Sequence, residues 1–222
     1  MVIDALVAGY PKLYHMADKR NWANICKYGL LSTTALLDLF EYDDEERIKI
    51  ESELRRKEIC ITHPVYGKAV IRDQDPMRDR PWKDIYLKNC LVRIEPQEWF
   101  RLLNKKTFFW PDTTGLNFML GATLYQNRSH YVITVDTRKL INRHADKITL
   151  SSINSGSLYG MKKRSRDTFK PMSVYAESRV REVAVEHSVP DILDLTISVD
   201  ECICRCDGGQ KICKKVRQIW LT

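Results

Sequence analysis

The order in which helical and strand-like segments follow one another limits this chain to a mixed fold. Three helical patterns occupy the first 57 residues, whereas most strand patterns come later. Strands and helices do not alternate with the regular period of a parallel α/β sheet. The sequence therefore predicts an α+β fold in which two packed sheets are flanked by helices.

Length and composition indicate one folded unit. Of the 222 residues, 44% are hydrophobic and 29% are charged, as in globular proteins. Without an internal repeat or a linker, this length predicts a single domain over residues 1–222, in which 201–222 supply closing strands. No apolar run approaches the roughly 18 residues of a membrane helix, and the N-terminus shows no export signal. We therefore expect a cytoplasmic protein without membrane contact.

Start and stop signals predict the early elements. Residues 12–16 have a strand pattern, after which Asp18 suits the N-cap of a helix that Gly29 would end. Ser32 suits the N-cap of a second helix, and a capping box predicts a third over residues 43–57.

Alternation and turn residues predict the later elements. We expect a hairpin over residues 59–72 and a helix that starts at Pro96, because proline suits the first helical position. Further patterns predict, in chain order, strand 107–110, helix 115–125, and strands 130–135, 180–187, 195–206 and 212–221. Between them, residues 151–171 form a long loop, and such loops inside domains are usually functional or disordered.

Charge is unevenly distributed along the chain. The formal net charge of +7 favours an acidic partner. Residues 38–58 contain nine acidic and five basic residues (net −4), whereas residues 138–181 contain eleven basic and three acidic residues (net +8). A basic stretch of this kind is either a solvated loop or a surface for nucleic acid, and charge alone leaves both interpretations open.

The seven cysteines are expected to be free thiols rather than a disulfide framework, because no export signal precedes them. Cys26, Cys60 and Cys90 lie among apolar residues and are interpreted as core residues. The other four are Cys202, Cys204, Cys206 and Cys213. The one-residue spacing of the first three puts them on one face of a strand, unlike a C-x2-C zinc knuckle. A cysteine-faced strand is the expected result, with a structural zinc ion as the alternative.

Common catalytic motifs are absent. The sequence has no phosphate-binding glycine loop, no nucleophile elbow and no H-E-x-x-H motif. Four features that can carry chemistry remain: His15, Arg72, the aromatic strand 108–110 and Glu182. Taken singly, each has a structural explanation, such as a hydrogen-bonded core histidine or a glutamate on the solvent face of a strand.

Together with their neighbours, these residues form blocks in a fixed order. The blocks are Tyr14-His15, Gly29-Leu30, an arginine after a hairpin, Phe108-Phe109-Trp110-Pro111, Asn117-Phe118-Met119-Leu120, a strand ending in Asp136, Arg181-Glu182-Val183-Ala184-Val185 and Val189-Pro190-Asp191-Ile192. This order, over residues 11 to about 200, resembles the DarT-like ADP-ribosyltransferases. Those proteins usually continue the aromatic strand with Asn-Pro-Arg, where this chain has Trp110-Pro111-Asp112-Thr113. Other blocks resemble an uncharacterised bacterial family, namely Leu13-Tyr14-His15-Met16, Val70-Ile71-Arg72-Asp73-Gln74 and Ser152-Ile153-Asn154-Ser155-Gly156.

The resemblance implies an ADP-ribosyltransferase fold that uses NAD as the ADP-ribose donor. His15 and Arg72 would belong to the catalytic set and also bind NAD, His15 as a donor to the nicotinamide ribose and Arg72 at the pyrophosphate or the reacting nucleotide. Phe109 and Tyr125 would pack on the nicotinamide, and Gly29 would let the main chain approach the dinucleotide.

Glu182 would be the catalytic carboxylate. Cleavage of the N-glycosidic bond builds positive charge on the ribose, and a nearby anion stabilises that charge. The residue lies on a strand whose other face carries Val183 and Val185. Glu186 and Glu177 are the alternatives, because a shift in strand register would bring a different carboxylate into the pocket.

The resemblance also implies an acceptor and partners. The acceptor would be a base in single-stranded RNA or DNA, and the enzyme would be the toxin of a toxin–antitoxin or phage-defence system, restrained by a protein antitoxin. Three alternatives stay open: a catalytically inactive nucleic-acid-binding module, a transferase that modifies protein, and a small zinc-dependent interaction protein.

Overall fold

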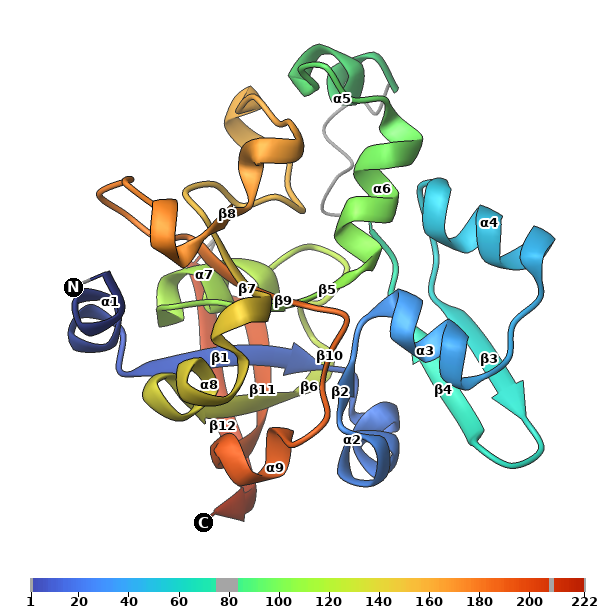
Figure 1. Ribbon diagram of the computed structural model, residues 1–222. Helices are drawn as coiled ribbons and strands as arrows, with labels where there is room; N and C mark the ends of the chain where they lie inside the picture. Colours follow the sequence, from blue (N-terminus) through green and yellow to red (C-terminus); the bar gives the residue numbers. More distant parts are fainter. Residues whose placement is uncertain (1, 75–83, 208–209, 222) are drawn as a thin grey trace.

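Two four-stranded antiparallel sheets form the centre of the protein, with helices around them (Figure 1). The computed structural model describes residues 2–74, 84–207 and 210–221. The first sheet has the order β1 (Lys12–Ala17), β6 (Ser129–Asp136), β11 (Thr196–Asp207) and β12 (Gln210–Leu221). The second has the order β5 (Lys106–Phe109), β9 (Glu182–Glu186), β7 (Ile148–Ser151) and β8 (Lys170–Pro171).

The two sheets share one hydrophobic core. Leu13 of β1 and Ile133 of β6 belong to the same buried cluster as Val183 and Val185 of β9. The face of β9 that was predicted to be apolar is therefore the face that meets the core. The predicted α+β class is confirmed, because nine α-helices and antiparallel sheets build a single domain from the described residues.

A smaller group of elements lies beside the sheets, at the right of Figure 1, and has its own core. Helix α3 (Thr33–Leu39) and helix α4 (Asp44–Ser52) pack there on the hairpin of β3 (Ile59–His63) and β4 (Gly67–Ile71). The hairpin is confirmed. The third helix was expected to reach residue 57, but it ends at Ser52, because Glu53 is extended.

Local signals set the boundaries of several elements. The Asp18 carboxylate accepts a hydrogen bond from the Arg20 N–H, as a cap of the 3-10 turn η1 (Lys19–Asn21) that precedes α2 (Trp22–Tyr28). The Ser32 Oγ accepts from the Ala35 N–H at 3.1 Å and caps α3. Both predicted N-caps are confirmed, although Asp18 caps the short turn and not the α-helix itself.

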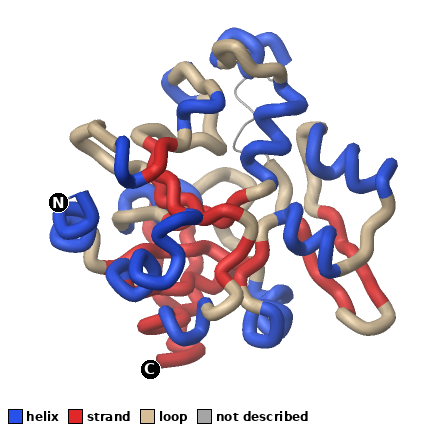
Figure 2. The backbone as a smooth tube through the Cα atoms, in the orientation of Figure 1, coloured by secondary structure: helices blue, strands red, loops and turns tan. Residues whose placement is uncertain are grey.

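The remaining helices show where the sequence signals were weaker. The helix at Pro96 is confirmed as α6 (Pro96–Asn104), whereas the helix expected over 115–125 is α7 (Thr113–Leu120), which Asp112 caps. Four helices were not predicted: α1 (Val2–Gly9), α5 (Asp84–Cys90), α8 (Thr137–His144) and α9 (Ile192–Leu195). Figure 2 shows these short helices on the outside of the strands. No helix among the described residues is both long and apolar enough to span a membrane.

The expectation of free thiols is wrong for two of the C-terminal cysteines. Cys204 and Cys213 form a disulfide, because β11 and β12 place them directly opposite each other with their Cα atoms 3.9 Å apart. This bond takes two thiols out of the set considered for zinc. No group of three or more potential ligands lies together among the described residues, and the side chain of Cys206 lies outside that part of the chain.

The isolated cysteines differ from one another. Cys90 is buried, as expected, against α6 and the end of the long loop. Cys26 and Cys60 are exposed, so their interpretation as core residues is wrong. The apolar residues next to them in the sequence point to a different side of the helix α2 or of the strand β3. The pattern of apolar residues alone did not distinguish the exposed side from the buried one.

Gly29 makes room for another part of the main chain. Its φ of 82° and ψ of −178° belong to a region that only glycine adopts freely. A Cβ atom at this position would lie 2.4 Å from the Pro190 Cα. The close approach lets β2 (Leu30–Leu31) pair with β10 (Ser188–Val189). Gly29 also lines the pocket described below, so its predicted role in admitting the dinucleotide stays a prediction, while its missing side chain has a structural reason in Pro190.

We expect Gly29→Ala to lower the free energy of unfolding by about 2 to 4 kcal/mol, through backbone strain plus the forced displacement of Pro190. Gly67→Ala is the matched control, because Gly67 also has a positive φ (79°) but has open space at the Cβ position. This control should lose only about 1 kcal/mol. Urea denaturation of both variants measures the difference, and equal losses would contradict the packing explanation.

Candidate active site

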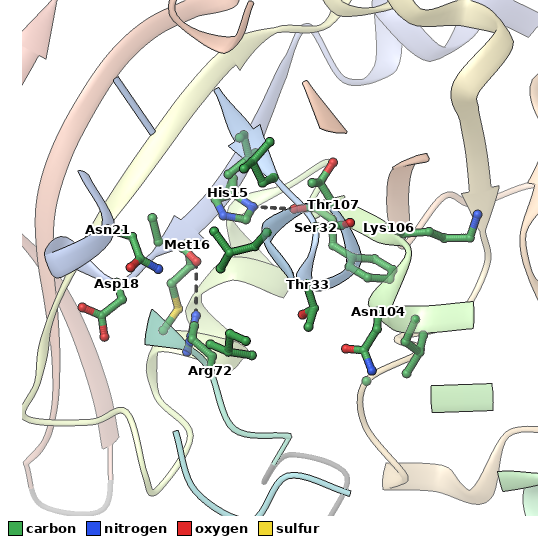
Figure 3. A pocket seen from close by; sticks show the side chains of 18 of the residues that line it. His15, Met16, Asp18, Asn21, Ser32, Thr33, Arg72, Asn104, Lys106 and Thr107 are labelled. Carbon is green, nitrogen blue, oxygen red and sulfur yellow. Dashed lines mark hydrogen bonds between the residues drawn. The ribbon is translucent and has the colours of Figure 1, made fainter. Parts of the chain in front are cut away.

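A pocket of about 300 Å³ lies where the two sheets and the hairpin meet. His15 comes from β1, Arg72 follows β4, and Glu182 is the first residue of β9; all three line the pocket. Figure 3 shows His15 and Arg72 on its wall, with Ser32, Thr33 and Asn104 around it. The structure thus brings together the three predicted catalytic residues, although they lie far apart in the sequence.

The His15 ring is buried and held by a hydrogen bond to the main chain of Phe108. Its Nδ1 lies 2.9 Å from the carbonyl oxygen of Phe108. Burial lowers the pKa of His15 to about 4, and the charge of Arg72 adds to this effect, whereas the bond to Phe108 opposes it. At neutral pH the ring is uncharged, with Nδ1–H donating to the carbonyl, so Nε2 carries the lone pair. On this tautomer Nε2 would accept a hydrogen bond from a ligand, and the predicted role of His15 in binding NAD stays a prediction.

Arg72 offers a buried donor without an acceptor. Its Nη1 donates to the carbonyl oxygen of Met16 at 3.1 Å, and its guanidinium lies 4.3 Å from the centroid of the Tyr125 ring. The Nη2 atom is buried and has no hydrogen-bond partner among the described residues. A buried guanidinium N–H in this state suits an anionic ligand, since unpaired buried donors are costly.

A buried arginine, Arg55, holds the main chain of Arg72 in place. The Arg55 Nε donates to the Arg72 carbonyl at 3.0 Å, and its Nη2 donates to the Asn104 Oδ1 at 3.0 Å. The Arg55 N–H donates to the Gln74 Oε1 at 3.1 Å, and the Gln74 N–H donates back to the Arg55 carbonyl at 2.8 Å. Sequence analysis missed Arg55, because no local pattern distinguishes a buried arginine from a surface one.

Glu182 is a buried carboxylate with one oxygen left open. The residue is 5% exposed, and its Oε1 accepts a hydrogen bond from the Ser155 N–H at 3.1 Å. Its Oε2 is buried and has no partner among the described residues. Burial raises the pKa of Glu182 to about 7, while Ser155 and Arg164 act in the opposite direction. A carboxyl group with such a pKa, inside a pocket, has the properties of a catalytic acid or base.

The two alternative carboxylates are bound elsewhere. Glu186 forms an ion pair with Lys106 at 2.5 Å, and Glu177 pairs with Lys170 at 3.0 Å. Neither is among the described residues that line the pocket. The register of β9 therefore favours Glu182 as the carboxylate of this site.

Two predicted nicotinamide contacts do not reach the pocket. Phe109 is completely buried in the shared core, and Tyr125 is buried beneath Arg72. Side chains alternate along β5, so Phe108 and Trp110, on either side of Phe109, line the pocket instead. The aromatic strand was identified correctly, but its inward residue was assigned to the wrong face.

Sequence analysis also missed the pocket contributions of two other segments. Asn154, Ser155 and Gly156 line the pocket from the long loop, where the recurring block at 152–156 was the available signal. From α7, Phe118 and Met119 line it as well. The expectation of a functional role for the loop stays a prediction, although its residues do contact the site.

Fold and site together define a single-domain α+β protein in which one pocket holds a buried carboxylate and a guanidinium with one buried nitrogen. The chain belongs to a family of unknown function (DUF7002), whose model matches residues 11–196. Comparisons with curated proteins and with solved structures find no match. The resemblance to an uncharacterised family is thereby confirmed at the level of a family of unknown function, and the ADP-ribosyltransferase resemblance stays a prediction.

The buried charge of Glu182 should make stability depend on pH. The pKa is about 7 in the folded protein and 4.5 in the unfolded chain, so stability from this group is full below pH 4.5 and is lost as pH rises through 7. The loss amounts to about 3 kcal/mol. Glu182→Gln does not titrate, so we expect the variant to gain about that much relative to wild type between pH 4.5 and pH 8.

Urea unfolding at acidic and alkaline pH measures this difference. Glu177→Gln is the control, because the Glu177 side chain is exposed and no comparable gain is expected. The same pH dependence in wild type and Glu182→Gln would show that Glu182 is not buried as an unpaired acid.

Proposed function

We propose that this protein is an NAD-dependent ADP-ribosyltransferase that transfers ADP-ribose to a base in single-stranded nucleic acid. The observation that carries the proposal is the presence, in one pocket, of a buried carboxylate oxygen of Glu182 and a buried guanidinium nitrogen of Arg72, neither of which has a hydrogen-bond partner in the part of the chain that the structure describes. NAD presents complementary groups, since its diphosphate is anionic and its nicotinamide ribose becomes cationic during transfer.

Glu182 would supply the negative charge that stabilises the ribose cation and would accept the proton that the acceptor releases. As the bond between ribose C1′ and nicotinamide breaks, its electron pair leaves with nicotinamide, and positive charge develops on the ribose next to the carboxylate. The acceptor nitrogen then bonds to C1′ and releases a proton. With a pKa of about 7, Glu182 can be ionised for the first step and can take up this proton in the second.

Arg72 and His15 would orient the donor. The free Nη2 of Arg72 can donate to a diphosphate oxygen, and the Nε2 of the neutral His15 can accept a hydrogen bond from a ribose hydroxyl. Both side chains are fixed by bonds to main-chain carbonyls, of Met16 and Phe108. Such preorganisation places the ribose without a further loss of side-chain freedom.

The acceptor side of the proposal rests on apolar side chains at the pocket. Trp110, Phe118 and Met119 line it, and Phe118 is 47% exposed, so a splayed-out base could stack there. The net charge of the basic stretch supports nucleic acid only in part, because ion pairs join many of its side chains to acids: Arg138 to Asp4, Arg143 to Asp191 and Asp194, Arg166 to Glu98, Lys170 to Glu177 and Arg179 to Asp112.

An enzyme that modifies the nucleic acid of its own cell is toxic. The proposal therefore includes a role as the toxin of a toxin–antitoxin or phage-defence system, restrained by a protein antitoxin in the cytoplasm. The choice between RNA and DNA is left to the experiment.

The direct test is incubation of the protein with labelled NAD and separate pools of total RNA, single-stranded DNA and cell protein. We expect label in one nucleic-acid pool, loss of that label in Glu182→Gln by several orders of magnitude, and full labelling in Glu177→Gln. Mass spectrometry of digested acceptor identifies the modified base.

Two other outcomes decide against parts of the proposal. Label in the protein pool alone would mean a protein-modifying transferase. Label in no pool, together with no thermal shift on adding NAD, would refute the transferase and leave an inactive nucleic-acid-binding module.

Phe118→Ala should weaken the binding of the nucleic-acid acceptor without affecting the binding of NAD. Loss of one base–aromatic stack costs about 1 to 3 kcal/mol, so we expect KM for the nucleic acid to rise about tenfold or more. Hydrolysis of NAD in the absence of acceptor should be unchanged. Leu124→Ala is the control, because Leu124 is 41% exposed but is not among the described residues that line the pocket. Equal effects of the two variants would argue against stacking at Phe118.

A further inference from the structure

The loop next to Glu182 is built around a buried arginine. Arg164 is 1% exposed and lies inside the curve of its own loop. Its guanidinium donates hydrogen bonds to four main-chain carbonyls, those of Asn154, Ser155, Ser157 and Lys162. A charged group that donates to several carbonyls of one loop fixes the conformation of that loop.

The main chain of Arg164 is anchored to a separate part of the fold. Its N–H donates to the Cys90 carbonyl at 2.8 Å, and its own carbonyl accepts from the Val92 N–H at 2.8 Å. The loop is thus tied at its far end to the segment that follows α5. Arg164 connects this anchor, through its side chain, to residues 154–157 at the pocket.

The other end of the connection is the carboxylate. Ser155, whose carbonyl accepts from Arg164 at 3.5 Å, donates its N–H to the Glu182 Oε1. The hydrogen bond occupies one carboxylate oxygen, and Oε2 has no partner within residues 2–74, 84–207 and 210–221. Glu182 can rotate only by giving up this bond.

We propose that Arg164 is a positioning residue for Glu182: by fixing the main chain of residues 154–157, it holds the Ser155 N–H on Oε1 and so orients the carboxylate. As a role in catalysis, the inference rests on the proposed function. As a physical link between two side chains, it can be tested without any activity.

Charged and titratable groups surround Glu182 from several elements. Arg164 comes from the loop, His15 from β1, Arg72 from the end of β4, and Lys106, paired with Glu186, from β5. Among them, Arg164 is the charged group that acts on the titration of Glu182, and its positive charge favours the carboxylate form. Loss of Arg164 therefore removes both a charge and the fixed N–H donor.

NMR of the whole chain labelled with ¹⁵N tests the link. The Ser155 amide resonance in wild type should shift with pH at a midpoint near 7, which is the pKa of Glu182, and this shift should be absent in Glu182→Gln. In Arg164→Gln the midpoint should move to higher pH, and in Arg164→Lys it should lie between the two. Arg166→Gln is the matched control, because Arg166 belongs to the same loop but is exposed and paired with Glu98.

An unshifted midpoint in folded Arg164→Gln, or a wild-type Ser155 amide that does not report Glu182, overturns the inference. If Arg164→Gln does not fold, the wild-type titration and the conservative Arg164→Lys variant decide the question.

Kinetics then tests the catalytic role. If the proposed transfer is observed, Arg164→Lys should lower kcat, leave KM for NAD unchanged and move the acidic limb of the pH–rate profile to higher pH. A Ser155 amide that titrates as expected, in a protein that transfers no ADP-ribose, would refute the proposed function and keep the link between Arg164 and Glu182.

Discussion

The pocket depends on the contact between two edge strands, β1 and β5. Tyr14 and Trp110 exchange two main-chain hydrogen bonds of 2.9 and 2.8 Å, which join the sheets at this point. The side chain of the next residue, His15, adds a hydrogen bond to the Phe108 carbonyl. Because β9 is the neighbour of β5, this joint also brings Glu182 to the same side as His15. Without it, the two sheets would carry their functional residues on unrelated surfaces.

Charged groups near the contact between β1 and β5 are unfavourable where they are buried. Two arginines that donate to main-chain carbonyls hold the segments that carry these groups in place. Arg55 holds the segment of Arg72, and Arg164 holds the loop that reaches Glu182. Each arginine supports a group, Arg72 or Glu182, whose hydrogen-bonding capacity is only partly satisfied among the described residues. A group with an open hydrogen-bonding position inside a protein persists only where its surroundings determine its place. Arg55 and Arg164 fix these surroundings through their bonds to main-chain carbonyls.

Caps, turns and strand alternation predicted most of the early elements, because Ser32, Pro96 and the hairpin act through neighbouring residues. The apolar side of β9 was predictable for the same reason. The interior of the site was not. Which face of β5 meets the pocket depends on its pairing with β1 and β9, and this decided between Phe108 and Phe109. The Cys204–Cys213 bond likewise follows from strand register, which cysteine spacing alone does not fix.

The family match ends at residue 196, where β11 begins, yet the fold does not divide there. β11 is an interior strand, paired with β6 on one side and β12 on the other. Cys204 of β11 packs in one cluster with Met16 and Tyr125. These two residues contact Arg72, Met16 through its carbonyl and Tyr125 through its ring. The strands beyond the family match therefore support the Arg72 guanidinium indirectly, through Met16 and Tyr125. Sequence variation in these strands would act on the pocket through packing rather than through direct contact.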